Sequence, residues 1–485
     1  MAEDATVGER AVRELRARIR RMRYEDIDLL SLEEDIREVL NGLGRELLAD
    51  GFARADFDDT ELIINGVHHG RVDRHSATIH TTFGPVEVKR TTYRRDRSSP
   101  VVSAFDKVLG IVEKFYTPKT ARVVSRLQAL LVKEDVCAVL SEVGGVSVGD
   151  ATVHRLPQSV MARYETRRDE VERRVREISH IPSEAVTVQV GLDGAMVPQD
   201  GEYARPRGRE PEGEPAPARH ERKYGVVGAD PPPCSSDGSV GCAWHEASVG
   251  TLAYFDFTGE HVGTTYFGRM PEANKATLDQ LLRAELATVL AQRPRLRVVF
   301  ASDGAPGHWN TIAQMRAGLP EYMRADAIEL LDFFHAAEHL QDACDAIDGK
   351  GSPEGRVRRL TWCETLKEFD NGVTRVLQAL RHQRRQAPSE RKRELIDTTI
   401  NYITKNQARM HYKEAIDQHL PIATGPTEAA AKSLVGVRMK RSGARYSQHG
   451  GQTILTLLAS HRSGRFEALM QTMFDGYTAT VRRAA

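Results

Sequence analysis

The stretch Val188-Gln189-Val190-Gly191-Leu192-Asp193-Gly194 decides how the middle of the chain is interpreted. Its apolar residues alternate with polar or small ones, which is the two-residue period of a β-strand, and its last glycine lets the backbone turn away. The stretch Leu296–Gly304 repeats this arrangement and also ends in Asp303-Gly304. An Asp-Gly pair after one strand usually marks only a turn. Two such strands side by side would place two carboxylates at one edge of a sheet.

Length and composition limit the class of protein. The chain has 485 residues, so roughly two to four domains are expected. Lys+Arg and Asp+Glu both total 68, so any argument for a polyanionic partner must come from local charge. Five scattered cysteines without a C-x-x-C pair indicate neither a zinc knuckle nor a disulfide framework. No signal peptide and no membrane-spanning run are evident, so we expect a soluble cytoplasmic protein without a membrane partner.

The first hundred residues predict a helical region followed by a basic hairpin. Residues 1–74 form a helical region that could serve dimerisation, with a helix expected to stop at Gly51. Residues 75–100 predict a β-hairpin around Gly84-Pro85. Its cations could follow a DNA backbone or could equally protect a solvated edge strand. The proposed DNA contacts there are Lys89, Arg90, Arg94 and Arg95.

Residues 101–180 have the outline of a helix-turn-helix. The pattern predicts helices over 118–132 and 134–143, a glycine break, and a short helix ending at Pro157. Thr152 and Arg155 on the third helix would then contact DNA. The alternative is an ordinary three-helix cluster, which can have the same outline.

Residues 181–339 predict the first part of an α/β catalytic core. After the Asp193 strand comes an irregular loop, 199–241, that is rich in proline and glycine. Strand, strand, strand, helix, strand, helix, strand is then the expected order. This is the order of a ribonuclease-H-like fold, a mixed five-stranded sheet with flanking helices. Such folds carry catalytic carboxylates on the first and fourth strands, where Asp193 and Asp303 fall.

The remaining chain predicts a helical insertion and the end of the core. Residues 340–420 show no strand pattern and are interpreted as an all-helical insertion domain, and residues 421–485 resume the core. Glu428 lies in the first turn of the expected final helix, where it could be a third acid or could only stabilise the helix dipole. The segment Ala429–Phe466 contains no acidic residue, which suggests contact with a polyanion. Its proposed DNA contacts are Arg438, Lys440, Arg441 and Arg445.

A trio of carboxylates predicts a metal-dependent reaction. Hard oxygen ligands suit Mg²⁺, with Mn²⁺ as a possible substitute. Two such ions can activate an attacking oxygen and stabilise a leaving one, which suits a phosphodiester. A calcium site is the alternative, and the basic segment argues against it.

Several motifs resemble bacterial insertion-sequence transposases of the DDE class, and most nearly the ISKra type. The matching stretches are Leu192-Asp193-Gly194, Trp244-His245-Glu246, Ser302-Asp303-Gly304, Asp332–Leu340, Gly425-Pro426-Thr427-Glu428, Arg438–Tyr446 and Gly450-Gly451-Gln452. The resemblance covers roughly residues 75 to 475. It departs from many relatives after the hairpin, where Arg94-Arg95-Asp96-Arg97 replaces a cysteine-rich metal module, and in the length of the 199–241 loop.

The resemblance implies particular residues, partners and activity. Asp193, Asp303 and Glu428 would be the catalytic acids and metal ligands, and Asp332 and His335 match an accessory D-x-x-H signature. The partners would be double-stranded DNA, both transposon ends and target, and further copies of the chain in a homodimer or higher oligomer near the nucleoid. The expected activity is binding of terminal inverted repeats followed by cleavage and strand transfer. The alternatives are a nuclease on the same fold and a transposase-derived DNA-binding protein without catalysis.

Overall fold

The structure is a computed structural model that describes residues 7–23, 25, 27–143, 146, 148–199, 243–441 and 444–484. The chain divides into two compact units. The first comprises Met1–Ile178 with Gly464–Ala485, and the second comprises Ser179–Ser463. Apart from Gln199, the expected 199–241 loop lies outside the described residues, as do Gly144 and Gly145 of the expected glycine break.

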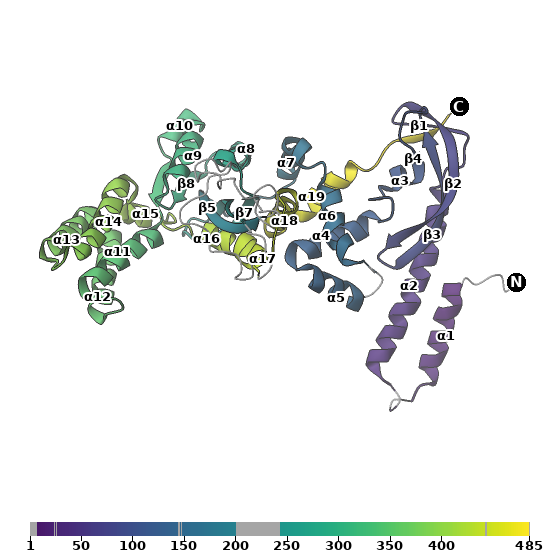
Figure 1. The fold of residues 1–485 in the computed structure, drawn as a ribbon, viewed down its shortest axis with the longest axis horizontal. Helices are drawn as coiled ribbons and strands as arrows, with labels where there is room; N and C mark the ends of the chain where they lie inside the picture. The colour runs from purple at the N-terminus through teal and green to yellow at the C-terminus, as the bar shows by residue number, and fades with distance from the viewer. Residues whose placement is uncertain are drawn as a thin grey trace, which may run out of the picture. The chain divides into compact units, whose positions relative to one another are not determined.

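Two antiparallel helices begin the first unit, α1 (Val7–Arg21) and α2 (Leu29–Arg54) (Figure 1). The expectation that the helix stops at Gly51 is wrong, because α2 continues to Arg54. Phe52, one residue later, is buried in a cluster with Ile79, Val86 and Phe105. A glycine inside a helix costs only about 1 kcal/mol, which burial of a phenylalanine exceeds.

A five-stranded antiparallel sheet follows, in the order β10-β1-β2-β3-β4. The strands are β1 (Glu61–Ile64), β2 (Val67–Thr81), β3 (Gly84–Arg94), β4 (Val102–Ser103) and β10 (Val481–Arg483). The expected hairpin is present, but Thr81 pairs with Gly84, so Thr82 and Phe83 make the turn. Because β10 pairs with β1, the C-terminal segment belongs to this unit and not to the α/β core in which the sequence placed it.

The helices of the first unit include the three of the helix-turn-helix outline. They are α3 (Ala104–Leu109), α4 (Pro118–Leu130), α5 (Lys133–Val143), α6 (Asp150–Met161), α7 (Arg168–Glu177) and α19 (Phe466–Asp475). Pro157 was expected to end the third helix and instead lies inside α6. It is buried beside Leu156, and Val160 beyond it is buried as well, so the apolar face of α6 continues past the proline.

The second unit is built on a mixed sheet in the order β7-β6-β5-β8-β9, flanked by helices. The strands are β5 (Thr187–Gln199), β6 (Ala243–Phe255), β7 (His261–Arg269), β8 (Arg297–Ser302) and β9 (Ile328–Leu331). β5 is antiparallel to β6 and parallel to β8, and β8 is parallel to β9. The helices α8 (Ala276–Gln292), α9 (Pro306–Ala317) and α10 (Glu321–Arg324) separate the later strands, so the predicted element order is confirmed.

The central strand β5 is buried on both faces. Val188, Val190 and Leu192 belong to the main hydrophobic core, together with Leu278 and Leu282 of α8. Gln189 on the opposite face is also buried, and its Nε2 donates hydrogen bonds to the carbonyl oxygens of Pro421 (3.4 Å) and Ala423 (3.1 Å). The strand therefore also holds the segment that leads into the last helices of the unit.

In the second unit, the regular elements described after β9 are all helices. The helices are α11 (Phe333–Asp348), α12 (Pro353–Glu368), α13 (Gly372–Gln386), α14 (Glu390–Asn406), α15 (Tyr412–Asp417), α16 (Gly425–Ala430), a π-helical turn (Ala431–Gly436), α17 (Val437–Met439) and α18 (Gln448–Arg462). Residues 340–420 contain no strand, as the sequence predicted. None of the described helices combines the length and the apolar character needed to cross a membrane.

Candidate active site at the edge of the mixed sheet

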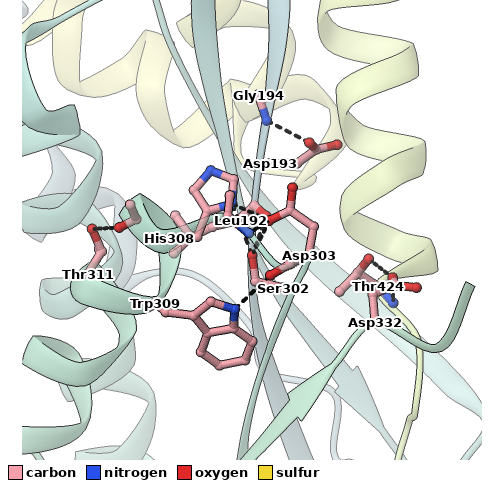
Figure 2. Close-up of polar contacts among 12 residues, drawn as sticks. Leu192, Asp193, Gly194, Ser302, Asp303, His308, Trp309, Thr311, Asp332 and Thr424 are labelled. Atoms are coloured by element: carbon pink, nitrogen blue, oxygen red, sulfur yellow. Dashed lines mark hydrogen bonds and ion pairs between the residues drawn. The ribbon is translucent and has the colours of Figure 1, made fainter. Parts of the chain in front are cut away.

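Asp193 lies within β5, and Asp303 directly follows β8, the neighbouring parallel strand, so the two occupy equivalent register positions. In the β5–β8 pairing Gly191 lies opposite Ala301, and each aspartate follows two residues later. The Ser302 hydroxyl donates to the Leu192 carbonyl oxygen across the same gap (3.3 Å; Figure 2). The register thus brings both carboxylates to one edge of the sheet.

Asp303 is held by donors from the loop and from α9. Its Oδ1 accepts hydrogen bonds from His308 Nδ1 (2.9 Å) and the Ala305 amide (3.1 Å). The Ser302 hydroxyl lies within hydrogen-bond distance of Asp303 Oδ1 (3.3 Å), the Leu192 carbonyl oxygen (3.3 Å) and His308 Nδ1 (3.0 Å), and its single hydrogen serves one acceptor at a time. Burial alone would raise the pKa of Asp303, but the hydrogen bonds from His308 and from the Ala305 amide outweigh it and lower that pKa to about 2. Asp303 is therefore an anion at every physiological pH.

Asp193 accepts fewer hydrogen bonds than Asp303 and lies in a different electrostatic environment. Its Oδ1 accepts a hydrogen bond from the Gly194 amide (2.7 Å). Burial raises the pKa of Asp193, the Gly194 amide lowers it, and the negative charge of Asp303 raises it further. Among the described residues neither aspartate forms an ion pair with a lysine or an arginine. Two half-buried carboxylates that repel each other form a site suited to a divalent cation.

Asp332 follows β9 at the same edge, but both of its oxygens are used within the protein. Oδ1 caps α11 by accepting from the amides of Phe334 (2.6 Å) and His335 (3.1 Å). Oδ2 accepts from the amide of Thr424 (2.7 Å) and from its hydroxyl. Asp332 is buried, and its contacts cap α11 and connect the start of that helix to Thr424 (Figure 2).

His335 and Glu428 lie at the margin of this edge. His335 is half exposed, its Nδ1 contacts Glu338 Oε2 (3.1 Å), and its charge lowers the pKa of both Asp193 and Asp303. Glu428 is exposed in the first turn of α16 and pairs with Lys432 (2.7 Å). Within the described part of the chain, no three acidic, histidine or cysteine side chains converge closely enough to hold a metal ion. Glu428 thus does not form such a group with Asp193 and Asp303 in this structure.

The helix that carries Glu428 is nevertheless packed tightly on the sheet. The Thr427 hydroxyl hydrogen bonds to that of Thr251 on β6 (2.7 Å). A Cβ at Gly191 would lie 2.0 Å from Thr427 Oγ1, so only glycine at this position of β5 permits the approach of α16. The backbone of Glu428 is therefore held against the sheet, so only its side chain would have to move for Glu428 to approach Asp193 and Asp303.

The residues proposed to bind DNA divide into buried and accessible ones. Arg90 is buried and pairs with Asp106 (2.9 Å), and Arg438 is buried beside Tyr446 (3.1 Å). Their assignment as DNA contacts is corrected, because both guanidinium groups are committed to the protein interior. The remaining ones are exposed or partly exposed: Lys89, Arg94, Arg95, Thr152, Arg155, Lys440, Arg441 and Arg445.

At least three of the accessible residues have partners within the first unit, and one of these is Arg95, which pairs with Asp96 (3.6 Å). Arg155 Nε pairs with Glu113 (2.9 Å), and the Thr152 hydroxyl lies 3.4 Å from that of Tyr116. Arg155 keeps more than half of its side chain exposed. Any contact it makes with DNA would therefore compete with Glu113.

The residues that connect Asp303 to the protein interior were not predicted from the sequence. His308 contacts Asp303 with one ring nitrogen and Lys275 with the other (2.8 Å), and Lys275 in turn pairs with Glu246 (3.2 Å). The sequence contained one usable signal, a histidine five residues after the aspartate and one turn into a helix. Nothing in the sequence linked it to Lys275 or Glu246, which lie on separate elements.

Comparison with known proteins finds no matching family model and no curated protein with a matching sequence. Two solved structures are similar in part. One is the Drosophila P element transposase strand transfer complex, with 11% identity, 73% of this chain and 80% of that chain covered, and a TM-score of 0.26. The other is the Mos1 transposase paired-end complex with left transposon end, with 13% identity, 62% and 78% covered, and a TM-score of 0.16. Scores this low carry no functional argument.

Proposed function

We propose that this chain is a DDE transposase with a ribonuclease-H-like core. It would bind the terminal inverted repeats of an insertion sequence and catalyse metal-dependent cleavage and strand transfer. The observation that carries the proposal is the in-register pair Asp193 and Asp303, on the first and fourth strands of a sheet ordered β7-β6-β5-β8-β9. The motif resemblance of the chain to insertion-sequence transposases supports the same conclusion.

The donors at this edge fit Mg²⁺ or Mn²⁺. Asp193 and Asp303 offer carboxylate oxygens without a competing lysine or arginine among the described residues, and Asp303 is ionised well below neutral pH. When bound, such ions supply Lewis-acid activation of the attacking oxygen and stabilisation of the leaving one. Glu428 would join as third ligand after releasing Lys432.

The other residues would bind and position DNA. Lys440 and Arg441 are exposed and directly follow α17, which a π-helical turn joins to the Glu428 helix, so they would contact phosphates near the reacting one. In the first unit Lys89 and Arg95 are exposed beside the hairpin and would contact the ends. Two ends must be processed together in strand transfer, so we expect a homodimer or a higher oligomer on DNA.

Two other functions compete with this proposal. A nuclease on the same fold would share the carboxylate pair, and would cut without joining. A transposase-derived DNA-binding protein would have no reason to keep two repelling carboxylates half buried at a sheet edge, and this favours an enzyme.

The test uses the full chain and DNA duplexes that span the sequences flanking its coding region. We expect Mg²⁺-dependent cuts at defined positions near matched inverted repeats, and joining of the freed ends to a supercoiled plasmid. Unrelated duplexes of equal length serve as the control. Cutting of all duplexes without joining would indicate the nuclease, and specific binding without cutting would indicate the non-catalytic protein.

A further inference from the structure

A continuous chain of polar side chains runs from Asp303 into the protein. Asp303 Oδ1 contacts His308 Nδ1 at 2.9 Å, and His308 Nε2 contacts Lys275 Nζ at 2.8 Å. Lys275 Nζ contacts Glu246 Oε1 at 3.2 Å. The side chain of His308 is 6% exposed, that of Glu246 18% and that of Lys275 23%, so these contacts form largely away from solvent.

The donor inventory of these groups settles where the proton of His308 lies. A lysine ammonium has three donors and no acceptor, so His308 Nε2 must accept and cannot carry a hydrogen. In the neutral ring the hydrogen then resides on Nδ1, which donates to Asp303. We propose that Lys275 is a positioning residue that fixes the Nδ1–H tautomer of His308 and thereby orients the carboxylate of Asp303.

The orientation leaves one oxygen of Asp303 available. Oδ1 already accepts from His308, from the Ala305 amide and from the Ser302 hydroxyl. None of the hydrogen bonds found among the described residues involves Oδ2. With the opposite tautomer a lone pair of Nδ1 would face Oδ1, and the Ser302 hydroxyl, whose Oγ lies 3.0 Å from Nδ1, would donate to that nitrogen instead of to Oδ1. Oδ1 would then lose two donors, and repulsion would turn the carboxylate away from its present position. Histidine partners of this kind commonly orient carboxylates and metal ligands in active sites.

The backbone around Lys275 supports a positioning role. Asn274 and Lys275 have φ angles of 55° and 52°, two consecutive left-handed residues immediately before α8. Such conformations are costly for residues with a Cβ and persist where the surroundings impose them. From this backbone position Lys275 Nζ contacts both His308 and Glu246.

Glu246 holds the far side of the ammonium group. Its carboxylate lies directly over Gly194, where an added Cβ would be 1.7 Å from Oε1. Gly194 is the residue after Asp193, so the lack of a side chain there makes room for the partner of Lys275. The Asp-Gly pair on β5 thus contributes to both carboxylates. It supplies Asp193, and its glycine leaves room for Glu246, whose partner Lys275 acts on Asp303 through His308.

The tautomer can be measured without any activity. We would label the histidines of the full chain with ¹⁵N and record two-bond ¹H–¹⁵N correlations at neutral pH, using His308→Asn to assign the signal. We expect a protonated Nδ1 and an unprotonated Nε2 in the wild type, and partial or complete conversion to the Nε2–H form in Lys275→Met. A wild-type His308 protonated on Nε2, or a Lys275→Met spectrum identical to the wild type, would overturn the proposal.

A second variant guards against loss of folding. Lys275→Met leaves Glu246 without its partner, so Lys275→Met combined with Glu246→Gln removes both charges together. We expect the same change of tautomer in this double variant, with an unchanged circular dichroism spectrum. A double variant that keeps the Nδ1–H form would show that Lys275 does not fix it.

The functional consequence rests on the proposed cleavage activity and is measured separately. Lys275→Met should lower cleavage or raise the Mg²⁺ requirement on the order of 10–100-fold. In a His308→Asn background, where the amide nitrogen replaces Nδ1–H, Lys275→Met should have no further effect. Additive losses would contradict action through His308. Absence of cleavage by the wild type would refute the proposed function and leave the tautomer measurement to decide this inference alone.

Discussion

Asp332 Oδ2 accepts hydrogen bonds from both the amide and the hydroxyl of Thr424, across 92 positions of sequence. Thr424 is the residue before α16, and the amide of Asp332 itself donates to the Ser302 carbonyl oxygen at the end of β8 (2.9 Å). The start of the helix that carries Glu428 is thus tied to the strand that carries Asp303. The geometry assigns Asp332 a role in placing α16.

Replacement of Asp332 should therefore act through structure. In Asp332→Asn the amide group can still cap α11, but it cannot accept from the Thr424 amide and hydroxyl as a carboxylate does. A buried donor left without a partner costs about 1–3 kcal/mol. We expect a lower midpoint of thermal unfolding and faster hydrogen exchange in α16. Asp326→Asn, at an exposed position near β9, is the matched control and should change neither.

The repulsion between Asp193 and Asp303 should destabilise the metal-free protein at neutral pH. Burial and the charge of Asp303 raise the pKa of Asp193 above its ordinary value of 3.8. The folded chain thus binds this proton more tightly than the unfolded chain, so its stability falls as pH rises from 3.8 through the raised pKa. Asp193→Asn should therefore unfold at a higher temperature than the wild type at pH 7, and the difference should shrink as the pH is lowered.

Magnesium provides the control for that experiment. The cation should raise the unfolding midpoint of the wild type at pH 7 and leave Asp193→Asn nearly unchanged, because one ligand is gone. Equal stabilisation of both proteins by Mg²⁺ would place the binding site elsewhere.

The Asp193→Asn variant should retain DNA binding and lose cleavage by about three orders of magnitude or more, since metal activation contributes several kcal/mol to the barrier.

The carboxylate pair was predictable because strand period and turn chemistry are local properties of sequence. The alternation in Val188–Gly194 and the apolar run before Asp303 identified two strands, and the element order placed them side by side. The burial of Arg90 and Arg438 was not predictable in this way. Whether an arginine is exposed depends on a partner such as Asp106, which lies on another element. The contact between His308 and Lys275 depends in the same way on tertiary structure.

Glu428 remains the predicted third acid, and its present ion pair defines the test. Glu428→Gln should abolish cleavage while DNA binding and unfolding temperature stay unchanged, because solvent screens the exposed pair with Lys432 and it contributes little to stability. Cleavage and binding are measured on the same end duplex. Glu414→Gln and Asp417→Asn on α15 should remain active.

Two further variants test the assignment of Glu428 as the third acid, the second against Glu338. Lys432→Met removes the competing cation and should leave cleavage intact, since Glu428 must release Lys432 to bind a metal. Glu338→Gln tests the acid that now contacts His335 and is largely exposed. An inactive Glu338→Gln protein together with an active Glu428→Gln protein would transfer the role of third acid to Glu338.

The hairpin arginines should fall into two classes that one experiment can separate. Arg90 is buried in a pair with Asp106, and Arg90 Nη1 also donates to the Lys114 carbonyl oxygen (2.7 Å), so Arg90→Ala should destabilise the first unit by about 3–5 kcal/mol.

Arg95 is 65% exposed, so Arg95→Ala should leave unfolding unchanged and weaken DNA binding. If Arg95 contacts a phosphate, the loss should be similar on all duplexes, and the slope of log affinity against log salt should become shallower by about one unit. Lys89→Ala, also exposed on β3, is the matched comparison. Unchanged DNA affinity in both exposed variants would show that the hairpin is a solvated edge, the alternative that its sequence left open.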